Sequence, residues 1–365
     1  MSSMKKLLKN KTACTNLITY LIVIIAFVVL HTLEQSGEMS SSLKGMLVPV
    51  CVYIVMAISL NLVVGISGEL SLGHAGFMGV GAFTGIVVAA VLKEPVADPT
   101  VRLLISMAVG GVFAGIAGFL IGMPVMRLRG DYLAIVTLAF GEILKNLIGN
   151  LYIGLDGNGL QAAFMSADSI ALEKGGKMIL KGALGATGVT KLATFPVAVG
   201  LVLFTLFVVL NLINSKEGRA IKAIRDNRIA AESVGLNVTA FRMKAFVISA
   251  FLAGMAGALF GQSMASTAPT KFSYTTSIDV LIYVVLGGMG NILGCIFSTT
   301  VLYILPKVMQ ELEDLRMILY AVVLIVLMIC TWSPKVKGFI QVITAWVKDK
   351  VTSLFQKKKE VGTNG

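Results

Sequence analysis

Long apolar segments recur along this chain, and they limit the folds that it can adopt. A helix of about 20 apolar residues crosses a hydrocarbon core roughly 30 Å thick. Charged residues make up 14% of the chain, whereas soluble domains carry about 25%. The sequence therefore predicts an all-α polytopic membrane protein. Its apolar segments cover approximately residues 17–31, 46–64, 70–92, 103–125, 131–153, 194–213, 243–262, 277–305 and 317–332.

Basic residues flank these segments and predict how the chain is oriented. The net charge is +12, and the Lys and Arg residues gather before the first apolar segment, within 214–244 and in the C-terminal tail. Cytoplasmic loops of membrane proteins are enriched in Lys and Arg. We therefore expect a cytoplasmic segment 1–16, a transmembrane domain 17–333 and a cytoplasmic tail 334–365. The same count places 214–244 inside and the loop 154–193 outside.

The number of crossings follows from the same rule. The segment 17–31 is followed by no small-x-small cleavage site, which predicts an uncleaved first helix. An even number of crossings is needed to return the basic tail to the cytoplasm. The segment 277–305 is too long for one span and is interrupted at Gly287-Gly288-Met289-Gly290-Asn291, so we expect it to be divided or re-entrant. The prediction is eight to ten transmembrane or re-entrant helices, with ten preferred.

Two connections between apolar segments are long enough to have functions of their own. The glycine-rich segment 154–193 is either a flexible external loop or a docking surface, because loops longer than about 12–15 residues are usually functional or disordered. The segment 214–244 has the pattern of a short amphipathic helix that stops at Gly235. Such a helix either lies on the membrane surface or docks a cytoplasmic partner.

Several classes of function are excluded by what the sequence lacks. The basic residues flank apolar segments, so their placement favours membrane topology over nucleic-acid binding. Two His and four scattered Cys residues provide no metal site, and no cofactor is expected. Lys11-Thr12 is the single Lys followed by Ser or Thr, and no glycine-rich run precedes it, so the chain has no Walker A loop. We expect a transport subunit without an active site of its own.

Two glycine-rich breaks stand out among the 38 glycines. The segment Gly65–Gly85 also contains Glu69, Ser71 and His74, and such polar residues are tolerated at membrane depth where they face protein or a water-lined cavity. This pattern predicts a broken or re-entrant helix that lines a path. The second break, Leu286–Asn291, has a comparable position in the second half of the chain. Paired breaks of this kind indicate an internal repeat around a midplane path.

The candidate path residues share a position in or beside these breaks or a polar character inside an apolar segment. They are Asn61, Glu69, Ser71, Gly73, His74, Gly76, Glu142, Gly287, Gly288 and Gly290. Two alternatives stay open. Most glycines of the apolar segments can be explained by close helix packing through small-xxx-small pairs. Glu142 can be explained by an i,i+3 ion pair with Lys145.

Four ordered motifs carry a family resemblance. They are the stretch Gly65–Gly85, the stretch RLRGDYLAIVTLAFGE from Arg127 to Glu142, the loop from GRAIKAIR at Gly218 to AAESVGLNVT ending at Thr239, and VLGGMG from Val285 to Gly290. Over roughly residues 45–335 the chain resembles the permease subunit of branched-chain amino-acid ABC transporters, and in particular the M-type member of the two-permease pair. The stretch GLDGNG at Gly154–Gly159 and Pro334–Gly338 match the family pattern only loosely.

The resemblance implies an ATP-binding-cassette importer in the bacterial cytoplasmic membrane, with both termini cytoplasmic. It implies a second permease subunit, two cytoplasmic ATPase subunits, an extracytoplasmic substrate-binding protein and the lipid bilayer as partners. It also implies that 218–239 couples to the ATPase, and the candidate coupling residues are Gly218, Arg219, Arg225, Arg228, Glu232, Ser233 and Gly235. Two alternatives remain: a urea or amide ABC permease of the same family, and an ion-coupled secondary amino-acid transporter, which would need paired carboxylates at membrane depth.

Overall fold

The computed structural model describes residues 11–36, 39–128, 130–156, 159–166 and 176–308, together with 321, 322 and 325. The chain divides into two compact units, Met1–Ile304 and Leu305–Gly365. In the second unit the described residues are helical: they are the end of α12 and the three isolated positions. Apart from these three positions, the predicted apolar segment 317–332 lies outside the described residues, as do the first ten residues and the tail 334–365. The description below concerns the first unit.

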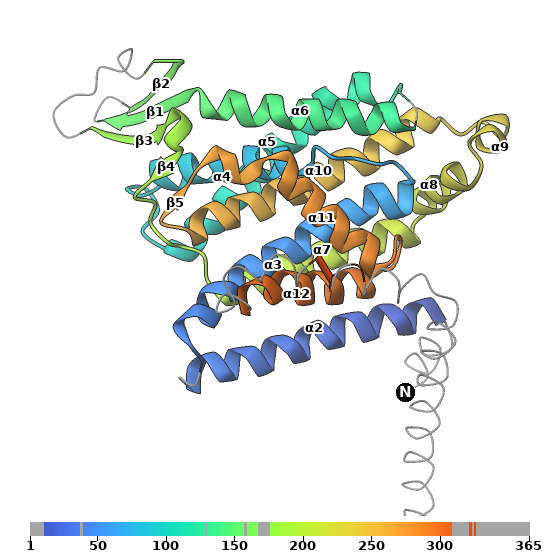
Figure 1. Ribbon diagram of the computed structural model, residues 1–365, viewed down its shortest axis with the longest axis horizontal. Helices are drawn as coiled ribbons and strands as arrows, with labels where there is room; N and C mark the ends of the chain where they lie inside the picture. Colours follow the sequence, from blue (N-terminus) through green and yellow to red (C-terminus); the bar gives the residue numbers. More distant parts are fainter. Residues whose placement is uncertain are drawn as a thin grey trace, which may run out of the picture. The chain divides into compact units, whose positions relative to one another are not determined.

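Helices form most of the first unit (Figure 1). In the described part of the chain, seven helical segments are long and apolar enough to cross a membrane, and two shorter apolar helices follow. This confirms the predicted class of a polytopic helical membrane protein. The long helices are α2 (Lys11–Ser36), α3 (Ser41–Asn61), α4 (His74–Val91), α5 (Pro99–Val125), α6 (Asp131–Gly149), α7 (Phe195–Asn214) and α10 (Val238–Ser263), and the short ones are α11 (Tyr274–Gly287) and α12 (Ile292–Val308).

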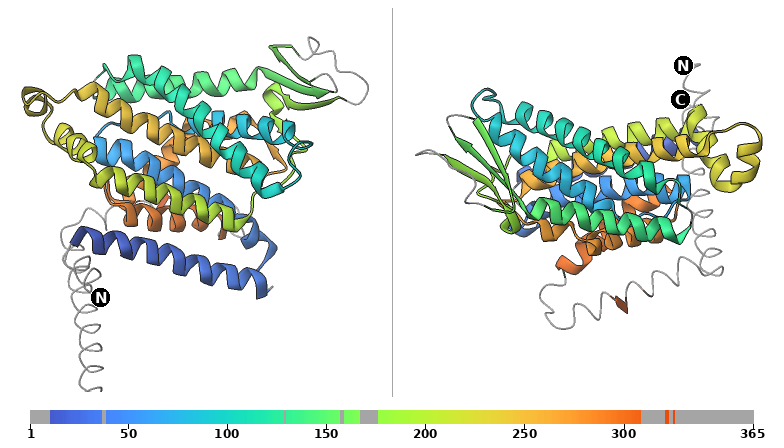
Figure 2. Two further views of the ribbon diagram at one scale, coloured as in Figure 1. Left: turned by 180° about the vertical axis from the view of Figure 1, so that it is seen from behind. Right: turned by 90° about the horizontal axis from the view of Figure 1, so that it is seen from above.

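The core of the bundle is formed where α10 packs along α4 and α5 (Figure 2). Glycines allow this close approach, because a Cβ atom added to Gly81 would overlap the backbone of Gly254, and one added to Gly257 would overlap the Met78 carbonyl oxygen. Lipid tails are as apolar as the side chains, so helices in a bilayer associate mainly through such close van der Waals packing. Close helix packing therefore explains Gly81 and Gly257, which is the alternative to a role in the path that the sequence left open for most glycines.

Both predicted glycine breaks interrupt helices. The last turns of α3 widen into a π-helical segment η1 (Leu62–Ser67), which ends at Gly68 with φ +76°. The chain is then irregular until α4 begins at His74. In the second half, α11 and α12 are separated by a turn in which Gly288 and Gly290 have φ values of +89° and +84°. The prediction that the 277–305 segment is divided is confirmed, whereas the internal repeat stays a prediction.

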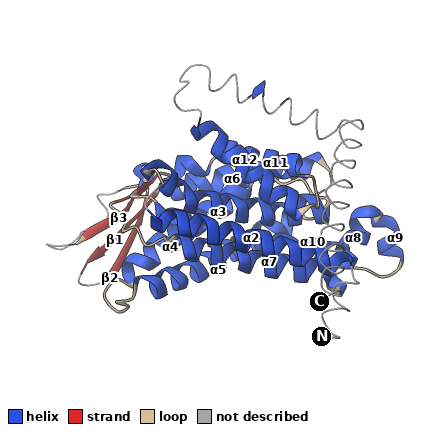
Figure 3. Cartoon of the chain, turned by 90° about the horizontal axis from the view of Figure 1, so that it is seen from below, coloured by secondary structure: helices blue, strands red, loops and turns tan. Residues whose placement is uncertain are grey.

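A small antiparallel sheet was not predicted. Its strands are β1 (Leu151–Asp156), β2 (Gly159–Phe164), β3 (Lys177–Lys181), β4 (Ala186–Thr187) and β5 (Ser266–Thr267), in the order β2-β1-β3-β4-β5. Leu151 pairs with Phe164 and Tyr152 with Lys181, and a short 3-10 helix η2 (Gly182–Leu184) follows β3. The described residues of 154–193 thus include ordered strands, which a flexible loop would lack; the docking role stays a prediction. The sheet lies at the opposite end of the helices from α8 and α9 (Figure 3).

Candidate functional site

The segment 214–244 folds into two short helices with their own caps. These are α8 (Lys216–Asp226) and α9 (Arg228–Ser233). The Ser215 hydroxyl accepts a hydrogen bond from the Gly218 amide at 3.1 Å, and the Asn227 side-chain oxygen accepts one from the Ala230 amide at 3.0 Å. Gly235 ends α9 with φ +84°, as predicted. The break at Asn227 was missed, although an Asn at this position is a strong N-cap signal.

The two helices form a unit with a small core, which we call the α8–α9 unit (residues 215–236). Ile224 and Ala231 are buried against Val238 at the start of α10. In contrast, Ile229 and Val234 are 81% and 75% exposed. The α8–α9 unit therefore presents two strongly exposed apolar side chains.

The remaining predicted coupling residues stabilise this unit. A Cβ atom on Gly218 would overlap the carbonyl oxygens of Leu212 and Ile213, so this glycine permits the tight turn from α7 into α8. Arg219 donates to the Asn214 carbonyl at 3.3 Å. Arg228 pairs with Glu232 at 2.9 Å along α9, and the Ser233 hydroxyl donates to the Ala230 carbonyl at 2.8 Å.

Arg225 links the α8–α9 unit to the first glycine break. Its Nη1 atom donates to the carbonyl oxygen of Gly65, in η1, at 2.8 Å. Gly68 makes room for the arginine, because a Cβ atom there would lie 2.5 Å from Arg225 Cγ. The carbonyl of Gly65 is available because the helical hydrogen-bond ladder ends here. A residue predicted for coupling thus contacts a segment predicted for the path, across 160 positions of sequence.

The two glycine breaks contact each other. The amide of Gly290 donates to the Asn61 side-chain oxygen at 2.8 Å. A Cβ atom on Gly65 would overlap the Gly290 amide nitrogen, and one on Gly287 would lie 2.6 Å from the backbone of Cys295 in α12. The turn between α11 and α12 is therefore held against the end of α3. Arg225, Gly65, Asn61 and Gly290 form a continuous chain of contacts.

Glu69 forms a buried ion pair with Arg242 of α10, whose side chain is 3% exposed. Arg242 also donates to the Met126 carbonyl at 3.4 Å. Burial raises the pKa of the Glu69 carboxyl above its usual value, and the charges of Arg242 and Arg228 oppose this shift. Arg242 was counted in the sequence only as a basic loop residue. No local pattern in the sequence indicates that its partner lies in the irregular segment before α4.

A buried polar network lies beneath the first break. His74 Nε2 and the Ser59 hydroxyl share a hydrogen bond at 2.8 Å, and the Ser249 hydroxyl donates to the Ser59 carbonyl at 2.5 Å. The Ala75 amide donates to the Ser277 hydroxyl at 2.9 Å. The network joins α3, α4, α10 and α11. The buried Ser71 hydroxyl has no hydrogen-bond partner among the described residues.

The other predicted path residues contact α6. A Cβ atom on Gly73 would overlap the Thr137 carbonyl oxygen, and one on Gly76 would lie 2.9 Å from the Gly141 Cα atom. Glu142 forms the predicted i,i+3 ion pair with Lys145. Its other carboxylate oxygen accepts a hydrogen bond from the Tyr274 amide at 2.9 Å, at the start of α11. Glu142 therefore joins α6 to α11, a role that its spacing in the sequence does not reveal.

The arrangement is that of a helical membrane bundle with a polar interior. Within the described residues, no group of three His, Cys, Asp or Glu side chains could hold a metal ion. Instead, broken helices and a buried polar network lie inside a membrane bundle and are joined to a surface unit. These features define a multi-pass helical permease.

The comparisons with known proteins agree with this class. The chain belongs to the branched-chain amino acid transport system / permease component family, whose model matches residues 42–331. It is 35% identical over 293 residues to the high-affinity branched-chain amino acid transport system permease protein LivM of Salmonella typhimurium and, separately, of Escherichia coli. Each match covers 78% of this chain and 67% of the relative.

A more distant match extends the family resemblance to an archaeon. The chain is 25% identical over 219 residues to a probable branched-chain amino acid transport permease protein LivM of Methanocaldococcus jannaschii, with 55% of each chain covered. No solved structure matches the chain.

Proposed function

We propose that this chain is the permease subunit of an ATP-driven importer that carries branched-chain amino acids by alternating access. The substrate is supported by the relatives, which are branched-chain amino acid permeases by name. The mechanism is supported most directly by one observation: Arg225 of the exposed α8–α9 unit donates to Gly65, where α3 loses regular helical geometry. Movement of a partner bound to this unit would therefore reach the break directly.

The partners are a second permease subunit, two cytoplasmic ATPases and an extracytoplasmic substrate-binding protein. The α8–α9 unit would dock the ATPase through Ile229 and Val234, and the sheet at the other end would face the binding protein. This arrangement agrees with a cytoplasmic location of the basic segment 214–244 and of both termini. ATP hydrolysis is assigned to the partner chains, since this sequence has no Walker A loop.

The path would open through the chain of contacts at the breaks. Closure of the ATPase dimer would shift the α8–α9 unit, Arg225 would pull on η1, and the Asn61–Gly290 hydrogen bond would carry the shift to α11 and α12. The buried network around His74 and Ser59 lies next to these elements and supplies polar groups for the charged ends of an amino acid. We therefore retain the predicted residues around both breaks as candidate path residues.

The test is reconstitution of the complex in proteoliposomes, with the substrate-loaded binding protein outside the vesicles and an ATP-regenerating system inside them. Leucine, isoleucine and valine uptake should require ATP and both ATPase subunits. Uptake by this chain alone, driven by an ion gradient, would instead support a secondary transporter. Competition by excess urea or short amides at the level of leucine would favour the amide permeases of the same family.

Removing the Arg225 side chain should weaken coupling. In Arg225→Met the link to Gly65 is lost, and we expect ATP-driven uptake to fall by about tenfold, within the usual range of coupling energies. Lys216→Met is the matched control, because it removes a positive charge from the same helix at an exposed position. Uptake that falls equally in both variants would show that net charge, not the Gly65 contact, is responsible.

A charge on the exposed apolar surface should prevent docking. Ile229→Asp would place a carboxylate in the proposed ATPase interface, and a single apolar anchor of this kind is commonly worth 2 kcal/mol or more, about 30-fold in affinity. We expect loss of the ATPase during purification of the complex, with normal amounts of permease in the membrane. Leu184→Asp is the control, since Leu184 is 70% exposed at the sheet end. Retention of the ATPase by Ile229→Asp would contradict the docking assignment.

A further inference from the structure

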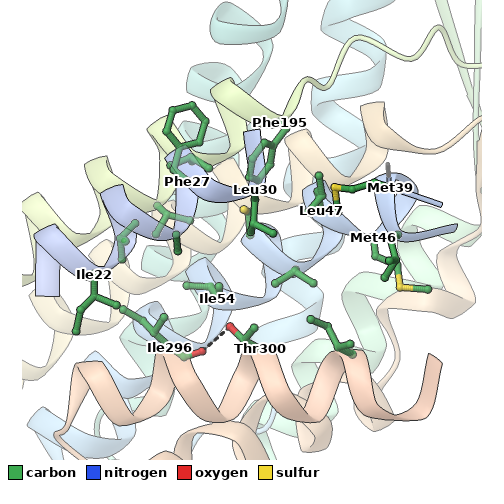
Figure 4. Close-up of a pocket in the computed structure, with 18 residues that line it drawn as sticks. Ile22, Phe27, Leu30, Met39, Met46, Leu47, Ile54, Phe195, Ile296 and Thr300 are labelled. Carbon is green, nitrogen blue, oxygen red and sulfur yellow. Dashed lines mark hydrogen bonds between the residues drawn. The ribbon is translucent and has the colours of Figure 1, made fainter. Parts of the chain in front are cut away.

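An apolar cavity of about 210 Å³ lies between α2, α3, α7 and α12 (Figure 4). Its 18 lining residues include Ile22, Phe27, Leu30, Leu47, Ile54 and Ile296. Thr300 supplies the one hydroxyl in this lining, and it donates to the Ile296 carbonyl at 2.8 Å within its own helix. An amino-acid substrate, with two charged ends, would find no partner here. The cavity is suited to a hydrocarbon chain.

A polar pocket adjoins this cavity at the ends of α2 and α3. It is lined by His31, Glu34, Gln35 and Lys44, with a volume of about 600 Å³, and Phe195 lines both spaces. Phe27 stacks on His31 at 5.3 Å and contacts Phe195 at 5.5 Å between ring centroids. Lys44 forms no ion pair with any carboxylate of the described residues. One space is therefore apolar, and the next presents an acidic and a basic side chain.

The position of the two spaces matches the layers of a bilayer. The 26 residues of α2 extend about 39 Å at 1.5 Å per residue, longer than a hydrocarbon core of roughly 30 Å. The polar pocket is at the C-terminal end of α2, where headgroups would lie. The family model begins to match at residue 42, so α2 adds a wall to the family core. The described residues bury little of α2.

We propose that this cleft binds one molecule of phosphatidylethanolamine. An acyl chain would occupy the cavity, the phosphate would lie beside Lys44 and the ammonium group beside Glu34. An amphiphile fits both spaces, because its acyl chain would fill the apolar cavity and its charged headgroup would meet Lys44 and Glu34, whereas a wholly apolar helix of a partner would supply no partner for these two charges. The two charges of the pocket match a zwitterionic headgroup better than phosphatidylglycerol, which has no positive charge for Glu34.

Photocrosslinking in nanodiscs tests this inference. The full-length permease, alone and with its partner subunits, is placed in bilayers that contain a trace of phosphatidylethanolamine with a diazirine in the middle of one acyl chain. Crosslinked peptides are then mapped by mass spectrometry. We expect the label to concentrate on peptides of α2 and α3 that line the cavity. A phosphatidylglycerol probe of the same chain length should label them at least fivefold less.

Two matched pairs of variants separate the site from general lipid contact. Val23→Phe fills the cavity, whereas Val28→Phe is the same change at a position of α2 that is 51% exposed and outside the lining. Lys44→Glu reverses the charge in the pocket, and Lys93→Glu reverses one elsewhere. We expect Val23→Phe and Lys44→Glu to reduce labelling at least fivefold and both controls to leave it unchanged. A variant that fails to fold is identified by the loss of a monodisperse peak in size-exclusion chromatography. If Val23→Phe fails to fold, Lys44→Glu still tests the site.

Three results would overturn the inference. The first is labelling spread evenly over exposed helices such as α5. The second is equal labelling by the phosphatidylglycerol probe. The third is loss of the label when the second permease is present, which would show that a partner helix covers the cleft.

Discussion

Replacing Gly81 with valine should prevent the permease from reaching a stable fold. A side chain at Gly81 would overlap the Gly254 backbone where α4 crosses α10. A backbone cannot move aside as a side chain can, so the two helices must separate. Overpacking of a core typically costs about 1–3 kcal/mol and occasionally more, and we expect about 3 kcal/mol or more here. The measurement is the midpoint of thermal or denaturant unfolding in detergent, together with the yield of monodisperse protein.

Gly200→Val supplies the matched control. Gly200 is in the middle of α7, and a Cβ atom there would meet nothing within 4 Å. Valine has a higher helix propensity than glycine by a few tenths of a kcal/mol, so we expect no loss of stability at this position. Gly81→Ala should fall between the two. If Gly81→Val and Gly200→Val unfold at the same point, the close crossing of α4 and α10 is not what these glycines provide.

Replacing Arg242 with methionine should destabilise the protein by about 3 kcal/mol, the lower end for a broken buried pair, because it leaves the Glu69 carboxylate, whose side chain is 17% exposed, without its partner. The double variant Glu69→Met/Arg242→Met should recover most of that loss, since replacing both members of a buried pair is often nearly neutral. The control is the neighbouring exposed pair Lys244–Glu217: Lys244→Met should cost less than about 1 kcal/mol. Chemical unfolding of the three variants and the unchanged protein separates these cases.

The loss in Arg242→Met should also depend on pH. Burial already raises the pKa of Glu69, and removal of Arg242 takes away the main charge that opposes this shift. A carboxyl whose pKa is raised by folding favours the folded state when protonated, and this contribution is lost as pH rises through the folded pKa. The defect should therefore be smaller at acidic pH than at alkaline pH. A defect that is the same across this range would mean that Glu69 stays charged or is solvated in the variant.

The spans and both breaks were predictable because their signals are local. An apolar run between charged flanks predicts a membrane crossing. A cluster of glycines beside the charged Glu69 predicts that the helix is interrupted there. The turn at Gly288–Gly290 follows from glycines that the structure places at positive φ. The caps of α8 and α9 also have a local signal, since Ser215 and Asn227 are typical N-cap residues, but the division of the segment at Asn227 was not predicted.

The contacts between the breaks were not predictable for a physical reason. The Arg225–Gly65 and Asn61–Gly290 hydrogen bonds join residues that are 160 and 229 positions apart, and helical periodicity contains no information on which helices become neighbours. The same holds for Arg242, whose charge was counted but whose partner was unknown. The sheet was missed because its strands are at most six residues long, and β1 and β3 lack the alternating pattern of a half-buried strand.

The pairing of β4 with β5 has a consequence for biogenesis. Ala186 pairs with Thr267 and Thr187 with Ser266, so the sheet joins a segment made before α7 to one made after α10. During synthesis the first four strands must wait on their side of the membrane until α7 and α10 have been inserted. Thr187 and Thr267 are 80 residues apart, which at roughly 5–20 residues per second is about 4–16 s. The sheet therefore cannot be completed before α7 and α10 have been inserted.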